Sequence, residues 1–253
     1  TKTGEISVHV TEMTVLSKSL RPLPIVKTDA EGNVFDAFDD PELRYRQRYV
    51  DLIVNNGVKD TFLKRATIVR TLRRILDDAG YTEVDTPILQ NIAGGASARP
   101  FITHFNALNQ DMYMRIATEL YLKRLIVGGF EGVYEMGKNF RNEGMDKTHN
   151  PEFTCMELYV SYKDLNWGMG FTEKMLAVQI STAVNGKPEV EIDGKVISFK
   201  APFRRLPILD AIKEKTGYDL YPMNEDEIRD VAKKLGIEVD ETMGKGKLID
   251  EIF

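Results

Sequence analysis

Hydrophobic and polar residues alternate with the period of a strand in some stretches of the chain and recur at helical spacing in others. In residues 4–24 a short alternation predicts a strand with one buried face, formed by Ile6, Val8 and Val10. Apolar residues recur at helical spacing from about 61 to 79, which predicts a helix with Asp60 as its N-cap. Residues 81–89 then predict a strand interrupted by Pro87, because proline cannot donate a hydrogen bond to a sheet.

The remaining pattern predicts a mixture of hairpins and helices. We expect hairpins at 101–116, 132–162 and 185–200, helices at 119–127 and 166–184, and short helices after residue 203. The fold class is therefore α+β, an antiparallel sheet flanked by helices. The expected parts are the end of a small β domain with a linker (1–24), a core (25–202) and an incomplete helical module (203–253).

Composition and charge narrow the functional classes. Hydrophobic residues make up 42% of the 253 positions and charged residues 29%, which is normal for a soluble globular protein. The net charge of −5 disfavours binding that relies on non-specific attraction to phosphates. A single cysteine, Cys155, allows no intramolecular disulfide and suits a reducing compartment. With no signal peptide or membrane-spanning run in this sequence, we expect a cytoplasmic location and no membrane partner.

The densest chemistry lies between Phe140 and Tyr159, in FRNEGMDKTHNPEFTCMELY. Turn-forming residues in its middle predict two strands joined by a loop. Because alternate side chains of a strand share a face, one face of the second strand is aromatic and acidic, with Phe153, Cys155, Glu157 and Tyr159. The other face suits a core, with Thr154, Met156, Leu158 and Val160. The first face is the candidate for a ligand.

The residue types on this hairpin suit a nucleotide and a cation. Arg141 offers planar bidentate donors to a phosphate, to which His149 can add another. Phe153 offers a flat surface to a nucleobase, and a carboxylate such as Glu157 within a sheet needs a cationic partner. Each residue also has a structural explanation: Arg141 in an ion pair with Glu143 or Glu157, Phe153 in a core, and His149 in a loop. The combination, and no single residue, predicts function.

The pattern FR-x-E, a loop and HNPEFT resembles the second signature motif of class II aminoacyl-tRNA synthetases. The ending EFT-x-MELY is similar to that of the lysyl members. GGASARPF at 94–101, RIATELYLKRL at 115–125, and a long helix followed by the Pro87 strand agree with this resemblance. Aspartyl relatives are expected to carry basic residues where Glu157 stands.

The resemblance implies an ATP site on the hairpin. Arg141 would hold the α-phosphate, Glu143 would contact the adenine amino group and Phe153 would stack on the ring. His149 and Asn150 would contact the phosphates and the base from the loop.

The resemblance also implies a lysine site. Glu157 and Tyr159 would bind the ε-ammonium, Glu119 and the Gly95 backbone the α-amino group, and Arg141 the carboxylate. A substrate with two ammonium groups needs two separated carboxylates, and Glu119 and Glu157 come from different elements. Taken without the family, Glu119 is equally a first-turn acid that complements a helix dipole.

The implied activity is ATP-dependent formation of lysyl-adenylate and transfer of lysine to the 3′ end of tRNA(Lys), with Arg141 as the catalytic residue. The family's third motif and its Mg²⁺ ligands are expected beyond Phe253, so no metal ligand is expected in this chain, and an anticodon-binding OB domain is expected before residue 1. On that expectation residues 1–253 alone have little activity.

Partners and alternatives complete the prediction. We expect a homodimer through the 61–79 helix and the strand around Pro87. Two alternatives stay open: a synthetase paralog that lysylates a protein, and a non-catalytic binding module derived from a synthetase. The 4–24 strand, as an OB remnant, argues against the first, and the intact Arg141, Glu143, Glu119 and Glu157 argue against the second.

Overall fold

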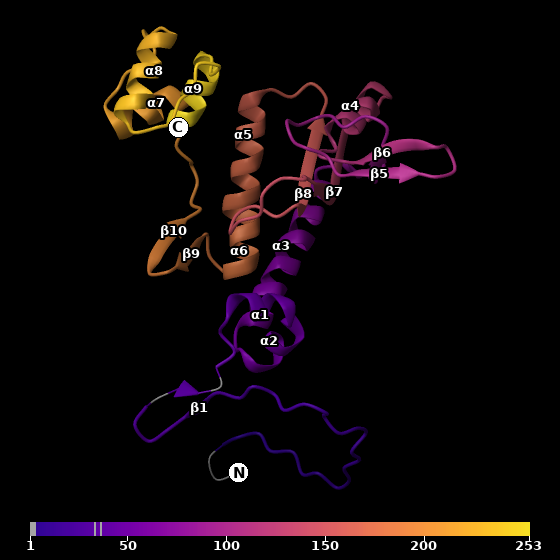
Figure 1. Ribbon diagram of the computed structural model, residues 1–253. Coiled ribbons are helices and arrows are strands. Elements are labelled where there is room, and N and C mark those ends of the chain that lie inside the picture. Colours follow the sequence, from indigo (N-terminus) through magenta and orange to yellow (C-terminus); the bar gives the residue numbers. More distant parts are fainter. Residues whose placement is uncertain (1–3, 33, 36) are drawn as a thin grey trace. The chain divides into compact units, whose positions relative to one another are not determined.

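The computed structural model describes residues 4–32, 34–35 and 37–253, and the chain divides after Ser161 into two compact units. The chain contains both helices and strands, which confirms the α+β class (Figure 1). The described elements of the first unit are β1 (Lys27–Thr28), β2 (Val34–Phe35), α1 (Pro41–Arg46), α2 (Arg48–Val54), α3 (Val58–Asp78), β3 (Thr82–Glu83), β4 (Leu89–Gln90), β5 (Ile102–Phe105), β6 (Gln110–Met114), α4 (Glu119–Val127), β7 (Gly132–Phe140) and β8 (Glu152–Val160).

The β7–β8 hairpin is the centre of the first unit. It joins β3 in a sheet of order β3-β7-β8, in which β3 runs parallel to β7 and β8 antiparallel. Strands β4, β6 and β5 form a second, antiparallel sheet. The predicted strand 81–89 is interrupted over residues 84–88, which include Pro87, and its two parts, β3 and β4, belong to different sheets.

Helix α3 contacts one face of the β7–β8 hairpin through two hydrogen bonds. Arg65 of α3 donates to the Thr154 hydroxyl at 3.0 Å, and the Tyr134 hydroxyl donates to Asp77 at 2.7 Å. These bonds place α3 along the Thr154 face of β8, on which Met156, Leu158 and Val160 are half buried and Thr154 itself is exposed. The Glu157 face is on the opposite side of the sheet.

The start of α3 differs from the prediction. The N-cap is Gly57, at φ +84°, and not Asp60, which lies in the first turn of the helix. Glycine adopts this left-handed conformation at little cost, so the helix can begin one turn earlier, and Asp60 instead complements the helix dipole. The end is as predicted, with Gly80 at φ +81° after the last turn.

The strand predicted in residues 4–24 is wrong. The described residues 4–26 contain neither helix nor strand. Ile6, Val8 and Val10 are largely exposed, at 100%, 83% and 64%. An alternating sequence forms a strand only when a neighbouring strand satisfies its backbone and an apolar surface covers one face, and this segment has neither in the described chain. The derivation of this segment from an OB domain stays a prediction.

The second unit contains α5 (Leu165–Glu173), a π-helical stretch (Lys174–Ile180), α6 (Ser181–Asn185), β9 (Glu189–Ile192), β10 (Lys195–Ser198), α7 (Ile208–Thr216), α8 (Glu225–Lys234) and α9 (Lys245–Ile252). The β9–β10 hairpin turns through Asp193 and Gly194, both at positive φ, as its Asp-Gly sequence predicts. Helix α8 begins with a capping box, in which Asn224 and Glu227 exchange side-chain and backbone hydrogen bonds. Helices α7, α8 and α9 enclose a core of Ile212, Leu220, Ile228, Val231 and Leu248.

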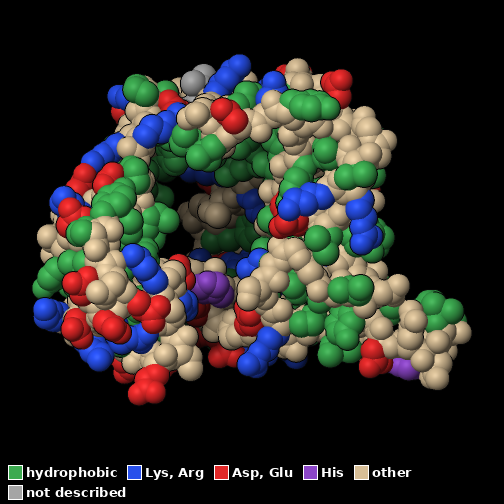
Figure 2. All heavy atoms as spheres, turned by 90° about the horizontal axis from the view of Figure 1, so that it is seen from above, with side chains coloured by type: hydrophobic (Ala, Val, Ile, Leu, Met, Phe, Trp, Pro, Cys, Tyr) green, Lys and Arg blue, Asp and Glu red, His purple; other side chains and the backbone are tan. Residues whose placement is uncertain are grey.

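Two surface properties bear on function. None of the helices in the described ranges combines the length and the apolar content that crossing a bilayer requires. On the face shown in Figure 2, Lys and Arg side chains (blue) are interspersed with Asp and Glu side chains (red). The net charge of −5 disfavours binding by non-specific attraction to phosphates.

Candidate active site

The β7–β8 hairpin sets out the candidate site residues in order along one face. Its register places Phe153 opposite Asn139, Cys155 opposite Gly137 and Glu157 opposite Glu135. Directly opposed residues of antiparallel strands share a face, so all of them lie on the side of the sheet away from α3. The face therefore runs from an aromatic end at Phe153 to an acidic end at Glu157.

Arg141 and Phe153 form the aromatic end. The guanidinium lies over the Phe153 ring, 5.1 Å from its centroid. The buried Nε atom of Arg141 has no hydrogen-bond partner among the described residues. A buried donor without a partner is costly, so this atom is suited to an incoming acceptor such as a phosphate oxygen.

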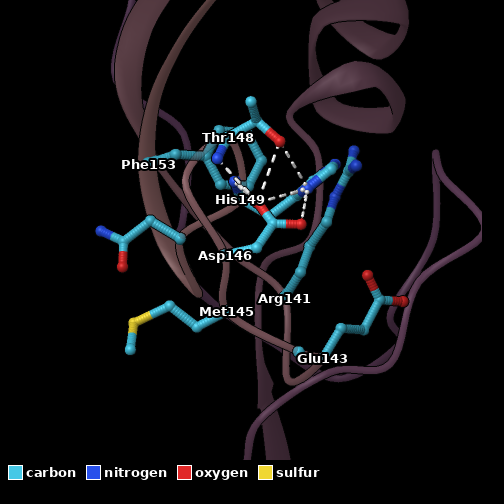
Figure 3. A pocket seen from close by; sticks show the side chains of 9 residues that line it. Arg141, Glu143, Met145, Asp146, Thr148, His149 and Phe153 are labelled. Atoms are coloured by element: carbon cyan, nitrogen blue, oxygen red, sulfur yellow. Dashed lines mark hydrogen bonds and ion pairs between the residues drawn. The ribbon is translucent and has the colours of Figure 1, made fainter.

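A pocket of about 500 Å³ opens beside these two side chains (Figure 3). Its lining contains all five residues predicted for ATP, together with part of the loop between β7 and β8: Arg141, Glu143, Gly144, Met145, Asp146, Thr148, His149, Asn150 and Phe153.

Asp146 organises the loop between the two strands. It accepts hydrogen bonds from the backbone N–H groups of Thr148 and His149, both at 2.7 Å, and its carboxylate lies 2.9 Å from His149 Nδ1 (dashed in Figure 3). The bond from the Thr148 backbone, followed by that from the His149 ring, holds the pKa of Asp146 well below its usual range. The loop is thus preordered, and Asn150 adds a bond of 2.8 Å to the Glu152 carbonyl.

Glu143 connects a second loop, which contains Arg99, to the site. Its carboxylate accepts from the Arg99 backbone N–H at 3.3 Å, and the Asn142 N–H donates to the Arg99 carbonyl at 2.7 Å. The Gly-rich segment that begins at Gly94 is therefore tied directly to the start of the motif.

Glu157 is the centre of the acidic end. Its two oxygens accept hydrogen bonds from the Thr118 backbone N–H at 3.3 Å and from the Tyr159 hydroxyl at 3.2 Å. Burial, and then the negative charges of Glu157 and Glu119, raise the pKa of Tyr159, so its phenol stays protonated near neutral pH. No ion pair of Glu157 is present among the described residues, which suits it to a cationic ligand.

Gly95 and Glu119 meet at the N-terminal end of α4. Gly95 has φ +87°, and a Cβ there would lie 3.0 Å from the Glu119 Cβ and 3.2 Å from the Ala117 Cβ. Only glycine fits this approach. The Glu119 carboxylate pairs with Lys123 at 2.6 Å on the same helix, so both explanations given for Glu119 remain open.

The predicted site residues thus form two groups, but sequence reasoning missed residues that support them. Thr118 presents its N–H to Glu157, while its own hydroxyl is buried without a partner in the described chain. Arg115 and Glu135 form a buried ion pair beneath the same face. A carboxylate in the first half of β7, GVYEM, which holds no other charged residue, was the signal that could have pointed to this pair.

The described residues do not fit an all-protein metal site, because no three His, Cys, Asp or Glu side chains of these ranges come together as ligands. We therefore assign no step of the chemistry to Mg²⁺.

Comparison with known proteins identifies the family. Residues 40–243 match the family described as tRNA synthetases class II (D, K and N). Over all 253 residues the chain is 63% identical to a lysine–tRNA ligase of Porphyromonas gingivalis, 60% to one of Azobacteroides pseudotrichonymphae and 59% to one of Christiangramia forsetii. It spans 43%, 50% and 44% of their lengths. The chain belongs to the class II tRNA synthetases of the D, K and N group.

Proposed function

We propose that this chain provides the ATP- and lysine-binding face of a lysine–tRNA ligase. The observation that carries the proposal is Glu157, a half-buried carboxylate held by Thr118 and Tyr159 and without a cationic partner in the described chain. A carboxylate in that setting selects a ligand with a positive end. The resemblance to lysine–tRNA ligases along the whole chain supports lysine as that ligand.

The proposed reaction has two steps. In the first, an oxygen of the lysine carboxylate attacks the α-phosphorus of ATP, a new P–O bond forms, and the bond to the bridging oxygen breaks to release pyrophosphate. In the second, the 3′ hydroxyl of the terminal tRNA ribose attacks the aminoacyl carbonyl, loses its proton, and AMP leaves. Neither step needs a nucleophilic side chain, so catalysis would rest on positioning and on stabilisation of charge.

Arg141 is proposed as the catalytic residue. Its guanidinium would neutralise charge at the α-phosphate and at the lysine carboxylate, while the adenine would stack on Phe153. The unpartnered Nε supports this role, since a phosphate oxygen would satisfy it. Glu143 is proposed to contact the adenine amino group, and His149 and Asn150 to contact the nucleotide from the pocket wall.

The lysine end is proposed to bind two ammonium groups. Glu157 and Tyr159 would take the ε-ammonium, and Glu119 with the Gly95 backbone the α-amino group. The close packing of Gly95 against Glu119 supports the second pairing. For Glu119 to serve, the substrate would displace Lys123 from its exposed ion pair, which costs little.

Further elements of the proposal concern the whole protein. We propose tRNA(Lys) as the second substrate, a cytoplasmic location, and Mg²⁺ ligands supplied outside the described residues. We also propose a homodimer that uses α3 and the segment around Pro87, since Phe62 and Leu63 of α3 and Leu89 of β4 are half exposed. Light scattering of the purified protein tests this part, and a monomer would contradict it.

Calorimetry tests the ligand assignment. The purified chain is titrated with L-lysine, L-aspartate and L-asparagine, each with and without a non-hydrolysable ATP analogue. Lysine is expected to bind. Aspartate, which has an acidic side chain, and asparagine, which has a neutral one, are not expected to bind. Preference for aspartate or asparagine would refute the assignment of Glu157, and so would a wild-type chain that binds none of the three.

A further inference from the structure

Two carboxylates lie directly opposite each other on the ligand face of the hairpin. Glu135 of β7 pairs in register with Glu157 of β8. The Cβ atoms of such a pair are about 5 Å apart, and like charges at this spacing repel. One of the two must therefore be neutralised within the protein, and the structure shows which one.

Arg115 neutralises Glu135. Both side chains are nearly inaccessible, with 3% and 2% of their surface exposed, and an Arg115 Nη1 hydrogen bonds to Glu135 Oε1. The other carboxylate oxygen of Glu135 accepts from the Thr86 hydroxyl at 2.6 Å. Glu135 is thus fully occupied, whereas Glu157 has only neutral donors, Thr118 and Tyr159.

The guanidinium is held on the Glu135 side by further contacts. Arg115 Nε donates to the Lys138 carbonyl at 2.8 Å, and Nη1 donates to the Thr86 carbonyl at 3.1 Å. Gly137 leaves the room that the guanidinium fills, since a Cβ there would collide with Arg115 Nη2. Gly137 is opposite Cys155, and the next pair along this face is Glu135 and Glu157. The Arg115 guanidinium at Gly137 therefore lies beside the pair that contains Glu157.

Arg115 could compete with the substrate ammonium for Glu157. Lysine binding at Glu157 requires that its ε-ammonium meet an unpaired carboxylate. A buried guanidinium beside that carboxylate is a rival cation, and it needs no entropy of association to pair. The Lys138 and Thr86 carbonyls contact the guanidinium, but only Glu135, among the described residues, pairs with its charge.

We propose that Glu135 and Arg115 are positioning residues for amino-acid recognition, in which Glu135 holds the Arg115 guanidinium away from Glu157 and so keeps Glu157 open to the substrate ammonium. Neither residue touches the substrate. This inference rests on the proposed function, because it concerns the ligand that Glu157 accepts.

Lysine titration of matched variants tests the inference. In Glu135→Gln the released Arg115 pairs with Glu157, so the Kd for L-lysine rises about tenfold or more, as expected for coupled charges in contact. In the double variant R115Q/E135Q the rival cation is gone, and the Kd returns to within about threefold of wild type. Affinity for the ATP analogue changes little in either variant, because Arg141 and Phe153 lie at the other end of the face.

Controls separate positioning from a loss of structure. Glu152→Gln removes the exposed Lys138–Glu152 pair of the same hairpin, on its other face, and should leave lysine affinity unchanged. If Glu135→Gln does not fold by circular dichroism, Glu135→Asp serves instead, since the shorter carboxylate holds Arg115 less closely and should weaken lysine binding several-fold.

The outcomes are distinguishable. Wild-type lysine affinity in Glu135→Gln, or in Glu135→Asp where that variant is used, overturns the inference and leaves the proposed function standing. A double variant as weak as Glu135→Gln overturns it too, because the pair would then serve structure alone. A wild-type chain that does not bind lysine refutes the proposed function itself.

Discussion

Glu157→Gln is the substitution that most directly tests lysine recognition, because it removes a charge and keeps the shape of the side chain. The Thr118 N–H can only donate a hydrogen bond, so the Gln carbonyl oxygen faces it and accepts that bond. Its NH₂ group then faces the Tyr159 hydroxyl, which can rotate and accept instead of donating. The variant should therefore fold normally and keep the local geometry.

The expected loss follows from the environment of Glu157. Removing one member of a buried hydrogen-bonded charge pair costs about 2–5 kcal/mol. Glu157 is only half buried, so the lower part of that range, about 2–3 kcal/mol, applies. At about 1.4 kcal/mol per tenfold, the Kd for L-lysine should rise about 30- to 150-fold.

Calorimetry of L-lysine binding at neutral pH measures this change, with the ATP analogue as the internal reference. Analogue affinity should stay within about twofold, since the residues proposed for ATP lie at the other end of β8. Glu152→Gln serves as the matched carboxylate control on the opposite face. A lysine affinity within threefold of wild type in Glu157→Gln would show that the ε-ammonium is bound elsewhere.

Three further substitutions or measurements test separate parts of the argument. Gly95→Ala forces a side chain into φ +87° and against Glu119, so calorimetry should show lysine affinity reduced and thermal melting a loss of about 1–3 kcal/mol. Ile228→Ala empties a fully buried position in the α7–α9 core and should cost about 2–5 kcal/mol, measured by urea unfolding; a smaller loss would mean that the core collapses around the site. Burial, and then the charge of Glu157, raise the pKa of the Cys155 thiol, so iodoacetamide should react slowly near neutral pH and faster as pH rises above the usual thiol range. Glu157→Gln should move that profile to lower pH, and an unchanged profile would contradict an effect of the Glu157 charge on the Cys155 thiol.

The sequence predicts elements well where the local pattern and the local structure have the same cause. The β9–β10 turn follows from Asp193-Gly194, and the start of α8 follows from the Asn224–Glu227 capping box, because each depends on residues a few positions apart. The two faces of β8 follow from its alternation for the same reason. These features need no knowledge of distant parts of the chain.

Prediction fails where the cause is distant or is a backbone conformation. Residues 4–24 alternate like a strand, but alternation does not provide the neighbouring strand. The N-cap at Gly57 depends on a positive φ, which a search for side-chain caps passes over. Thr118 contributes to the site through its backbone N–H, so its side chain type carries no signal.

The ligand end of the hairpin shows why a motif alone does not identify a binding residue. Glu135 and Glu157 are both carboxylates in strands, on one face and in direct register, and the sequence does not distinguish them. Their partners do: Arg115 lies outside the hairpin, before α4, and it reaches Glu135 because Gly137 leaves space. An ion pair that is complete within the protein offers no binding energy to a ligand, whereas a carboxylate with only neutral donors does. Specificity on this face is therefore decided by which carboxylate the fold leaves without a cation, and a change at Arg115 or Glu135 should alter recognition without touching a predicted site residue.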